Sequence, residues 1–225
     1  MNAIQRAAVA IAAMTLAAAP VAAQDGFFDA KRDGDFLVRL RGLAVIPNEE
    51  LSTAAIPGAD ASISTAVVPE LDFTYFFTDN IAAELILAVT PHDVRGRGAL
   101  AGANLGDVWL LPPTLTLQYH VDQLGDWTGM ESLAALKPYV GAGVNYTMFL
   151  GEDAGQFQKI RYDDAFGFAL QAGLDYEIAE GVYLNADVKY IFLETDWTLD
   201  TGAGTVGGNV EINPLIIGLG VGYRF

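Results

Sequence analysis

The sequence contains no cysteine and only two histidines among its 225 residues. Without cysteine there is no disulfide framework, so an exported domain needs another source of stability. Basic residues are also few: 12 Lys and Arg against 28 Asp and Glu give a formal net charge of −16. This charge argues against nucleic-acid binding, which depends on neutralising phosphates. It equally excludes a membrane-surface protein that binds through a polybasic patch.

Patterns that carry catalysis or metal binding are missing as well. The four serines occupy no nucleophile-elbow setting, and no metal-ligand spacing is visible. They are Ser52, Ser62, Ser64 and Ser132. The sequence therefore predicts no enzyme, no catalytic residue, no cofactor and no metal site. We expect His120 to hydrogen-bond inside the molecule near a turn, and His92 to lie at an external rim.

No apolar stretch is long enough for a membrane-spanning helix. The longest run, from Ala7 to Ala19, has about 13 residues, whereas a spanning helix needs about 20. With Arg6 before it and Val21-Ala22-Ala23 after it, this run is typical of a secretory signal peptide. We therefore predict a signal peptide at residues 1–23 and one mature domain at 24–225. Cleavage removes Arg6 and no acid, so the charge moves from −16 to −17.

Alternation of residue types is what the sequence has in abundance, most clearly at its end. One row is large and apolar: Leu215, Ile217, Leu219, Val221, Tyr223 and Phe225. The other row is mostly small or charged: Gly218, Gly220, Gly222 and Arg224. A period of two indicates a strand, but a soluble sheet carries ordinary polar residues on its solvent face. The pattern instead fits a strand with one face toward lipid and the other toward a lumen.

Eight segments alternate in this way, and the connections between them alternate between short and long. The segments are 35–46, 62–77, 81–92, 108–121, 137–149, 166–178, 182–193 and 215–225. The long connections are 47–61, 95–106, 151–163 and 198–208, while 78–80 and 179–181 are tight turns and 122–136 is a longer exception. Outer-membrane barrels have short periplasmic turns and long external loops. The sequence thus predicts an all-β, eight-stranded antiparallel up-and-down transmembrane barrel in the bacterial outer membrane, with both termini periplasmic.

Several specific runs are similar to the OmpW family of small outer-membrane barrels. They are Leu71–Leu85, Leu111–Tyr119, Lys137–Thr147 and the closing Gly222–Phe225. The resemblance implies an eight-stranded porin-like barrel that lets small hydrophobic compounds across the outer membrane. The terminal Tyr223 and Phe225 also resemble the signal that the barrel-assembly machinery reads. One departure is Lys189, at a lumen position where relatives can carry a bulky aromatic residue.

The inward rows predict a lumen with two halves. Toward the periplasm we expect an ion-pair plug, because charges in a lumen persist only when paired. Its residues are Arg39, Arg41, Glu70, Asp72, Glu84, Lys137, Asp175, Glu177, Asp187, Lys189 and Arg224. Toward the outside we expect an apolar ligand pocket. Its residues are Leu43, Val45, Ile86, Ala88, Phe149, Ile191, Leu193 and Ile216. Inward glycines should enlarge this pocket: Gly141, Gly143, Gly167, Gly173, Gly218, Gly220 and Gly222.

The preferred interpretation is a passive conduit for small hydrophobic molecules. Because a charged plug would stop such a molecule, lateral exit into the membrane is a hypothesis, favoured by Pro69, Pro112 and Pro113, which lack amide donors. One alternative is a structural or surface-interaction barrel with a packed lumen, and a weaker one is a soluble lipocalin-like binder. The expected partners are outer-membrane lipid and lipopolysaccharide, small hydrophobic compounds and the assembly machinery. We expect a monomer.

Overall fold

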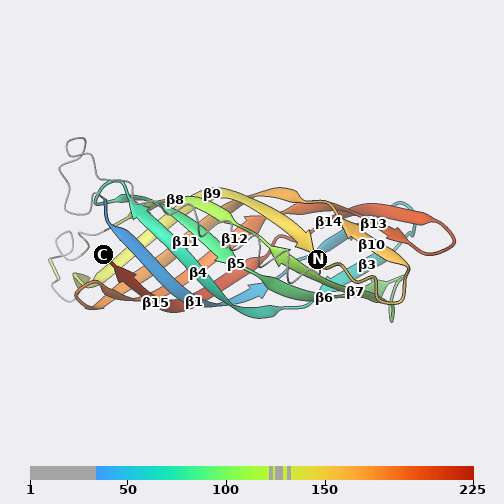
Figure 1. Cartoon of the computed structure of the whole chain (residues 1–225), viewed down its shortest axis with the longest axis horizontal. Helices are drawn as coiled ribbons and strands as arrows, with labels where there is room; N and C mark the ends of the chain where they lie inside the picture. The colour runs from blue at the N-terminus through green and yellow to red at the C-terminus, as the bar shows by residue number, and fades with distance from the viewer. Residues whose placement is uncertain (1–33, 122–123, 125–128, 131–132) are drawn as a thin grey trace.

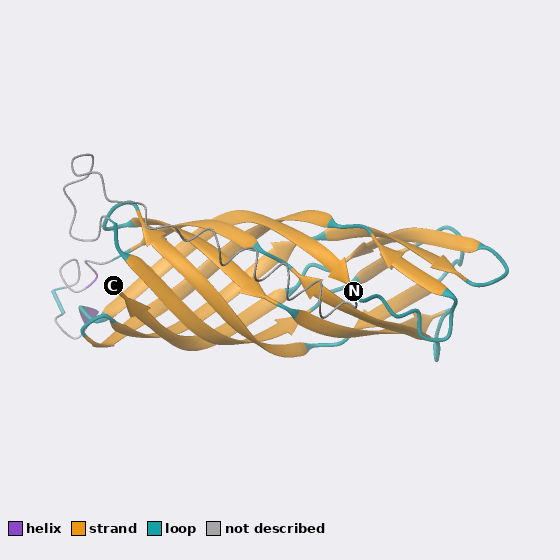
Figure 2. Cartoon of the chain, in the orientation of Figure 1, coloured by secondary structure: helices purple, strands orange, loops and turns teal. Residues whose placement is uncertain are grey.

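A computed structural model of the chain describes residues 34–121, 124, 129–130 and 133–225. The expected signal peptide at 1–23 and the start of the expected mature domain lie outside these residues. Strands make up most of the described chain (Figure 2). Within the described residues, no helix is both long and apolar enough to cross a membrane.

Eight strands form a closed antiparallel barrel, which confirms the predicted fold class. Their order around the barrel is β1-β4-β5-β8-β9-β11-β12-β15, and β15 pairs with β1 to close it (Figure 1). Closure leaves no free sheet edge, so every strand has two partners in an environment without water. The bounds are β1 Phe36–Ile46, β4 Ala66–Phe76, β5 Ile81–Ala88, β8 Thr114–His120, β9 Leu136–Leu150, β11 Ala165–Ala179, β12 Val182–Phe192 and β15 Leu215–Arg224.

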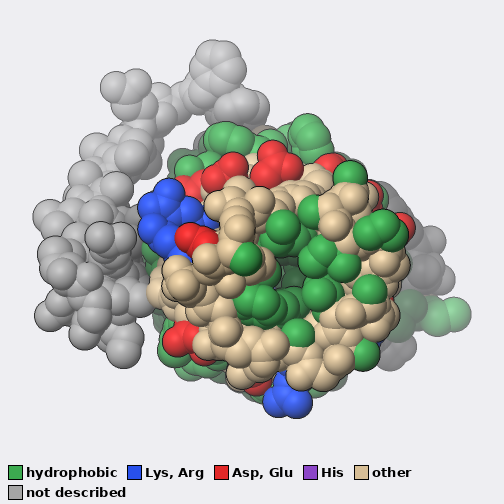
Figure 3. All heavy atoms as spheres, turned by 90° about the vertical axis from the view of Figure 1, so that its right-hand side faces the viewer, with side chains coloured by type: hydrophobic (Ala, Val, Ile, Leu, Met, Phe, Trp, Pro, Cys, Tyr) green, Lys and Arg blue, Asp and Glu red, His purple; other side chains and the backbone are tan. Residues whose placement is uncertain are grey.

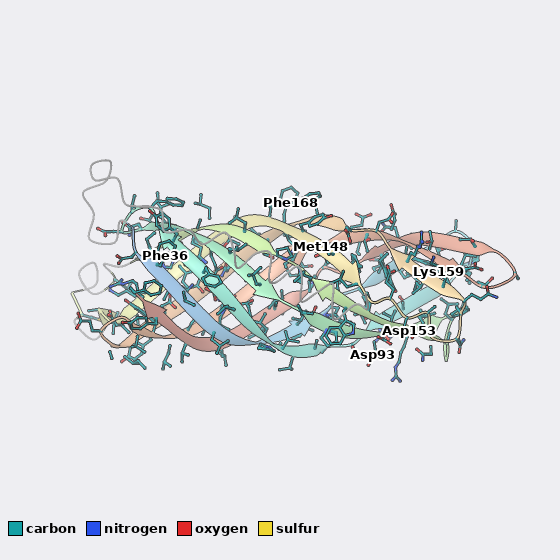
Figure 4. The ribbon with its side chains drawn as sticks, viewed as in Figure 1. Phe36, Asp93, Met148, Asp153, Lys159 and Phe168 are labelled. Atoms are coloured by element: carbon teal, nitrogen blue, oxygen red, sulfur yellow. The ribbon has the colours of Figure 1, made fainter. Side chains whose placement is uncertain are left out.

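The apolar rows face outward and the charged rows face the lumen. Leu219 and Val221 are 64% and 51% exposed, whereas Arg39 is fully buried. Phe168 projects from the outer surface of the barrel (Figure 4). This orientation confirms the predicted alternation and excludes the lipocalin-like alternative, in which the apolar rows would line the interior. From Phe166 to Tyr176 the outward row spans about 33 Å of strand, or about 25 Å along the axis at the usual tilt of about 40°.

The barrel continues at one end into an extension made of seven shorter strands. They are β2 Glu50–Ser52, β3 Ala59–Ile63, β6 Thr90–Gly98, β7 Asn104–Leu111, β10 Lys159–Tyr162, β13 Glu194–Asp200 and β14 Thr205–Glu211. They form two groups, β3-β6-β7 and β10-β13-β14-β2 (Figure 1). The expectation of long loops at 95–106 and 198–208 is therefore wrong, because most of these residues are paired in hairpins. Gly106 lies inside β7 at a φ of 97°, where the β6–β7 register shifts, whereas Gly98 ends β6 and Gly102 and Gly202 lie in the turns.

Prolines mark the level at which barrel strands give way to extension strands. Pro47, Pro91 and Pro214 lie at three of these junctions, and Pro112-Pro113 separates β7 from β8. Proline donates no backbone hydrogen bond, so it interrupts a sheet ladder where it stands. The alternation stays in phase across the double proline, since Val108, Leu110, Thr114 and Thr116 are all buried, but Leu111, which has outward parity, is buried as well.

Asn213 holds the junction between β14 and β15 in an unusual backbone conformation. Its φ is 36°, the one positive value at a non-glycine residue within the described chain. Its side-chain oxygen accepts a hydrogen bond from the Leu193 amide at 3.0 Å, and its side-chain nitrogen donates to Glu211 at 2.9 Å. Asparagine tolerates the left-handed region better than most residues and here also satisfies a neighbouring amide.

Asn213→Ala should lower the free energy of unfolding by about 1–3 kcal/mol, because it adds backbone strain and orphans the Leu193 amide. Asn213→Gly should cost less, since glycine removes the strain and loses only the hydrogen bonds. Urea unfolding of the refolded barrel in detergent measures both. Equal stability of the alanine variant and the parent chain would contradict this account.

Candidate functional site

A large apolar chamber occupies the outer half of the barrel and continues through the extension. Viewed from the extension end, hydrophobic side chains gather around a central hollow (Figure 3). The empty space, including the part that opens to solvent, is about 1260 Å³. All eight residues expected to form the apolar pocket line it: Leu43, Val45, Ile86, Ala88, Phe149, Ile191, Leu193 and Ile216. Whether they bind a ligand stays a prediction.

The extension supplies much of this chamber, and the sequence analysis missed its contribution. Trp197 and Leu199 of β13 and Leu105 and Val108 of β7 are buried and line the chamber. The alternation of Thr195, Trp197 and Leu199 with charged or polar residues was a readable strand signal. This alternation continues beyond the length that a strand needs to cross a membrane. Part of it was therefore predicted as a loop.

The sequence predicts His92 at an external rim, but it lies inside the chamber wall. Its ring is buried, and its Nδ1 atom lies 2.7 Å from the carbonyl oxygen of Ser64. Of the outward residues of β6 around it, Pro91 is apolar but Asp93 and Arg95 are charged, and these charges place the strand beyond the lipid-facing band. Burial lowers the pKa of the His92 imidazole. The ring is therefore neutral at neutral pH and adds no charge to the wall.

A layer of buried charges forms the floor of the chamber, and Arg39 is at its centre. The Arg39 guanidinium donates to both oxygens of Asp175, at 3.1 and 2.6 Å, and to Asp72 at 3.2 Å. It also donates to Thr74 at 2.9 Å and Glu84 at 3.3 Å. These partners belong to β11, β4 and β5, which lie on different sides of the barrel, so the Arg39 side chain spans the lumen.

Arg41 extends the same network toward the chamber. It contacts Glu70 at 2.5 Å, Asp72 at 3.1 Å and Glu84 at 3.4 Å. Its Nη1 atom lies 3.6 Å from Asp187. Eight of the eleven residues expected in the plug are buried in this layer: Arg39, Arg41, Glu70, Asp72, Glu84, Asp175, Asp187 and Lys189. The layer therefore pairs three cations with five carboxylates.

The other three expected plug residues lie outside the buried layer, at the end of the barrel that carries the tight turns. Lys137, Glu177 and Arg224 are half-buried. Lys137 stands opposite Asp175 in the β9–β11 register. Arg224 lies 3.5 Å from Asp35 and over the ring of Tyr183. The expected near-balance of five cations and six anions is thus not found within the buried layer, because these three positions are too close to the barrel end.

Below the charged layer, aromatic and apolar side chains close the lumen a second time. Leu37, Phe76 and Tyr183 are buried there. His120 is buried near the turn, as expected, with ring centroids 4.9 Å from both Phe76 and Tyr139. The Arg39 guanidinium lies 5.3 Å from the centroid of Tyr139, which joins the two layers.

The inward glycines make room for the charged layer and not for a ligand. A Cβ on Gly173 would lie 2.2 Å from the ring of Tyr139, and one on Gly220 would lie 2.7 Å from both Cα and Cγ of Arg41. On Gly222 it would lie 3.0 Å from Cγ of Arg39. None of the seven glycines is among the residues that line the chamber. The expectation that they enlarge the pocket is wrong, because long side chains from neighbouring strands fill the space they leave.

Pro112-Pro113 forms a thin part of the wall between the chamber and the outer surface. Pro112 lines the chamber, whereas Pro113 lines a small apolar groove on the outside. The two prolines donate no backbone hydrogen bonds to β9. The Asn145 side chain bridges the gap, donating to Thr114 Oγ1 at 2.9 Å and to the carbonyl oxygens of both prolines at 3.3 and 3.4 Å.

Comparison with known proteins identifies the family of this barrel. The family model described as the OmpW family matches residues 32–225. The chain belongs to the OmpW family. It is also similar to an uncharacterised outer-membrane protein of Sinorhizobium fredii, at 48% identity over 84% of this chain and 79% of the relative. The crystal structure of the outer-membrane protein OprG of Pseudomonas aeruginosa superposes with a TM-score of 0.76 and 30% identity, over 88% of this chain and 99% of OprG.

Another family relative has a name that refers to an apolar compound. The dibenzothiophene metabolism operon protein PahQ of Pseudomonas aeruginosa is 28% identical, over 78% of this chain and 79% of that protein. Together these relatives identify the chain as an outer-membrane barrel of the OmpW type.

The charged layer should be sensitive to the loss of one partner. Arg39→Met should lower the free energy of unfolding by about 3–5 kcal/mol, because it leaves buried carboxylates without their cation. Arg224→Met, at the half-buried barrel end, should cost less than about 1 kcal/mol. Urea unfolding of both variants in detergent tests the comparison. Similar losses would mean that the Arg39 network does not hold the barrel interior together.

Proposed function

We propose that this outer-membrane barrel gives passive passage to small hydrophobic molecules. The chamber is the observation that supports this proposal, because it is large, almost wholly lined by apolar side chains and open at the extension end (Figure 3). Transfer of an apolar molecule from water into such a space is favourable in proportion to the area it buries. A packed lumen, as in the structural-barrel alternative, would leave no such space.

The charged layer acts in this proposal as a plug that stops axial movement. An apolar molecule that entered it would have to separate guanidinium–carboxylate pairs without providing hydrogen bonds in return. The aromatic layer around Phe76 and Tyr183 lies below it and gives no second path. The molecule therefore has to leave the chamber sideways.

The exit in this proposal is the wall at Pro112-Pro113. The chamber lies on one side of the double proline and the outer apolar groove on the other. A main-chain bond from Tyr146 to Pro113 at 3.0 Å and the side-chain bonds of Asn145 are what hold β9 to this segment. Parting the wall here breaks fewer ladder bonds than elsewhere. Leu85, Leu115 and Val144 line the groove, so a molecule would emerge against lipid-facing side chains.

The same proposal implies an orientation of the barrel in the membrane and a set of partners. The tight turns and both ends of the barrel chain would face the periplasm, and the extension would face outward. The lipid-facing rows would contact outer-membrane lipid and lipopolysaccharide, and Tyr223 and Phe225 would engage the assembly machinery. A monomer suffices, because a single chain closes the barrel.

Filling the chamber should slow uptake. Ala88→Phe places a ring where Ala88 lines the chamber. We expect the uptake of N-phenyl-1-naphthylamine, an apolar dye, to fall at least about fivefold in cells that carry equal amounts of folded barrel. The reason is that the ring occupies space that a ligand needs.

Leu87→Phe is the matched control, because Leu87 belongs to the outward row of the same strand. It should leave dye uptake within about twofold of the parent chain. Unchanged uptake in Ala88→Phe would instead favour the structural or surface-interaction barrel.

A disulfide beside the double proline should reduce transport by holding the wall closed. Leu115 and Val144 are direct partners in the β8–β9 register, a geometry that a disulfide can bridge. The parent chain has no cysteine, so Leu115→Cys with Val144→Cys gives a single pair. We expect dye uptake to be low when the pair is oxidised and to recover on reduction.

The control staple joins Leu40→Cys and Leu71→Cys, partners in the β1–β4 register away from the double proline. It should not change uptake between oxidised and reduced forms. Equal uptake by the Leu115→Cys/Val144→Cys variant in its reduced and oxidised forms would rule out exit at this wall, while leaving the chamber itself in place.

A further inference from the structure

Lys189 is the one cation of the charged layer that no described residue holds by a hydrogen bond. Its side chain is 2% exposed, and its nearest ion-pair partner is Asp187, with Nζ and Oδ1 3.8 Å apart. By contrast, Arg39 and Arg41 each donate to several acceptors. An ammonium group has three donors, and burying them without acceptors is costly.

The position of Lys189 directs it toward the chamber. It lines the chamber together with Glu70, at the boundary between the apolar wall and the charged floor. Glu70 accepts a hydrogen bond from Arg41 at 2.5 Å. In the β12–β15 register Lys189 stands opposite Ile216, itself a chamber residue. A buried donor therefore meets a mostly apolar space where that space borders the charged floor.

We propose that Lys189 recognises the polar end of the transported molecule. The chamber then binds an apolar compound that has one hydrogen-bond-accepting oxygen, with this oxygen directed toward Lys189 and the charged layer. The proposal rests on the proposed function and narrows its substrate class from hydrophobic molecules in general to neutral ketones, aldehydes, esters or alcohols with an apolar chain. Such an oxygen satisfies a donor that has no hydrogen bond to a described residue, at the boundary between the apolar wall and the charged floor.

The surrounding charge favours a neutral acceptor over a carboxylate. The buried layer already pairs five carboxylates with three cations. Asp187 Oδ1 is buried, accepts no hydrogen bond within the described chain and lies next to Lys189. An anionic head group would add a further negative charge beside it, where low dielectric strengthens the repulsion. A carbonyl or hydroxyl oxygen adds none.

Trp197 shows that a second unsatisfied donor faces the outer part of the same chamber. Its side chain is buried and lines the chamber, and its Nε1 atom has no hydrogen-bond partner among the described residues. It lies eight positions along the chain from Lys189, which is up to about 26 Å of extended chain. One donor thus lies near each end of an apolar space, so a molecule with a single oxygen meets a donor both on arrival and at the floor.

The test compares two probes of equal chain length, 2-decanone and decane, by displacement of the apolar dye from the full barrel in nanodiscs. We use the ratio of their affinities in each variant, because partition into lipid then cancels. Lys189→Met should lower the 2-decanone preference about tenfold. The double variant Asp187→Asn/Lys189→Met keeps the same excess of buried carboxylates over buried cations as the parent chain. It should show the same loss of 2-decanone preference. Arg161→Met, which removes an exposed cation of the extension, should leave the ratio unchanged.

The outcomes separate this inference from the proposed function. If neither probe displaces the dye from the parent barrel, the proposed function fails. If both probes bind and the ratio is the same in the parent chain and in the two Lys189 variants, Lys189 is structural and the inference fails. Tighter binding of decanoate than of 2-decanone would overturn the choice of a neutral head group. In the parent chain, a shift of the Lys189 ¹⁵Nζ resonance with 2-decanone and none with decane would support it directly.

Discussion

The contact on which this structure depends is the bundle of guanidinium–carboxylate pairs that Arg39 and Arg41 make across the lumen. Buried ion pairs give little net stability over an apolar packing of the same volume, because desolvation offsets the attraction. Their effect here is on what the lumen can admit. A cross-section filled by paired charges, with Tyr139 and Phe76 beneath, excludes an apolar molecule far more strongly than a narrow apolar neck would.

In the proposed function, the chamber and the lateral exit both depend on that closed floor. An apolar space that ends on paired charges is a dead end along the axis, so the proposed route passes through the wall. Pro112-Pro113 interrupts the strand ladder where the chamber lies on one side and the outer groove on the other. The extension suits this arrangement, because it carries the mouth of the chamber beyond the lipid-facing band. In the proposal, a molecule would arrive above the membrane and would leave at the level of the barrel.

The alternation of side chains made the barrel and its two-part lumen predictable. Each strand assigns its residues to lipid or lumen by parity alone, and Arg39, Asp187 and Leu219 all lie where parity puts them. Parity could not supply what depends on neighbouring strands. The glycines were taken for empty space because the sequence does not show that Tyr139 and Arg41 fill it. The extension strands were taken in part for loops because they exceed what a bilayer requires. Leu111 has outward parity but is buried beside the double proline, which parity alone does not predict.

Three interruptions of the strand ladder are bridged by side chains, two in the extension and one at the double proline, and the choice of side chain follows the solvent around each. In the extension no described strand pairing joins β2 to β3 or β9 to β10. There carboxylates accept from backbone amides across the seams: Glu49 from Ile63 at 3.2 Å, and Glu152 from Tyr162 at 2.7 Å. In the barrel, beside the outer apolar groove, the neutral amide of Asn145 instead donates to the carbonyl oxygens of the double proline. A carboxylate is well solvated beyond the bilayer but costly within it. The strongly acidic composition of the chain therefore belongs in large part to the extension, where acids can close seams that lipid-facing strands must close without charge.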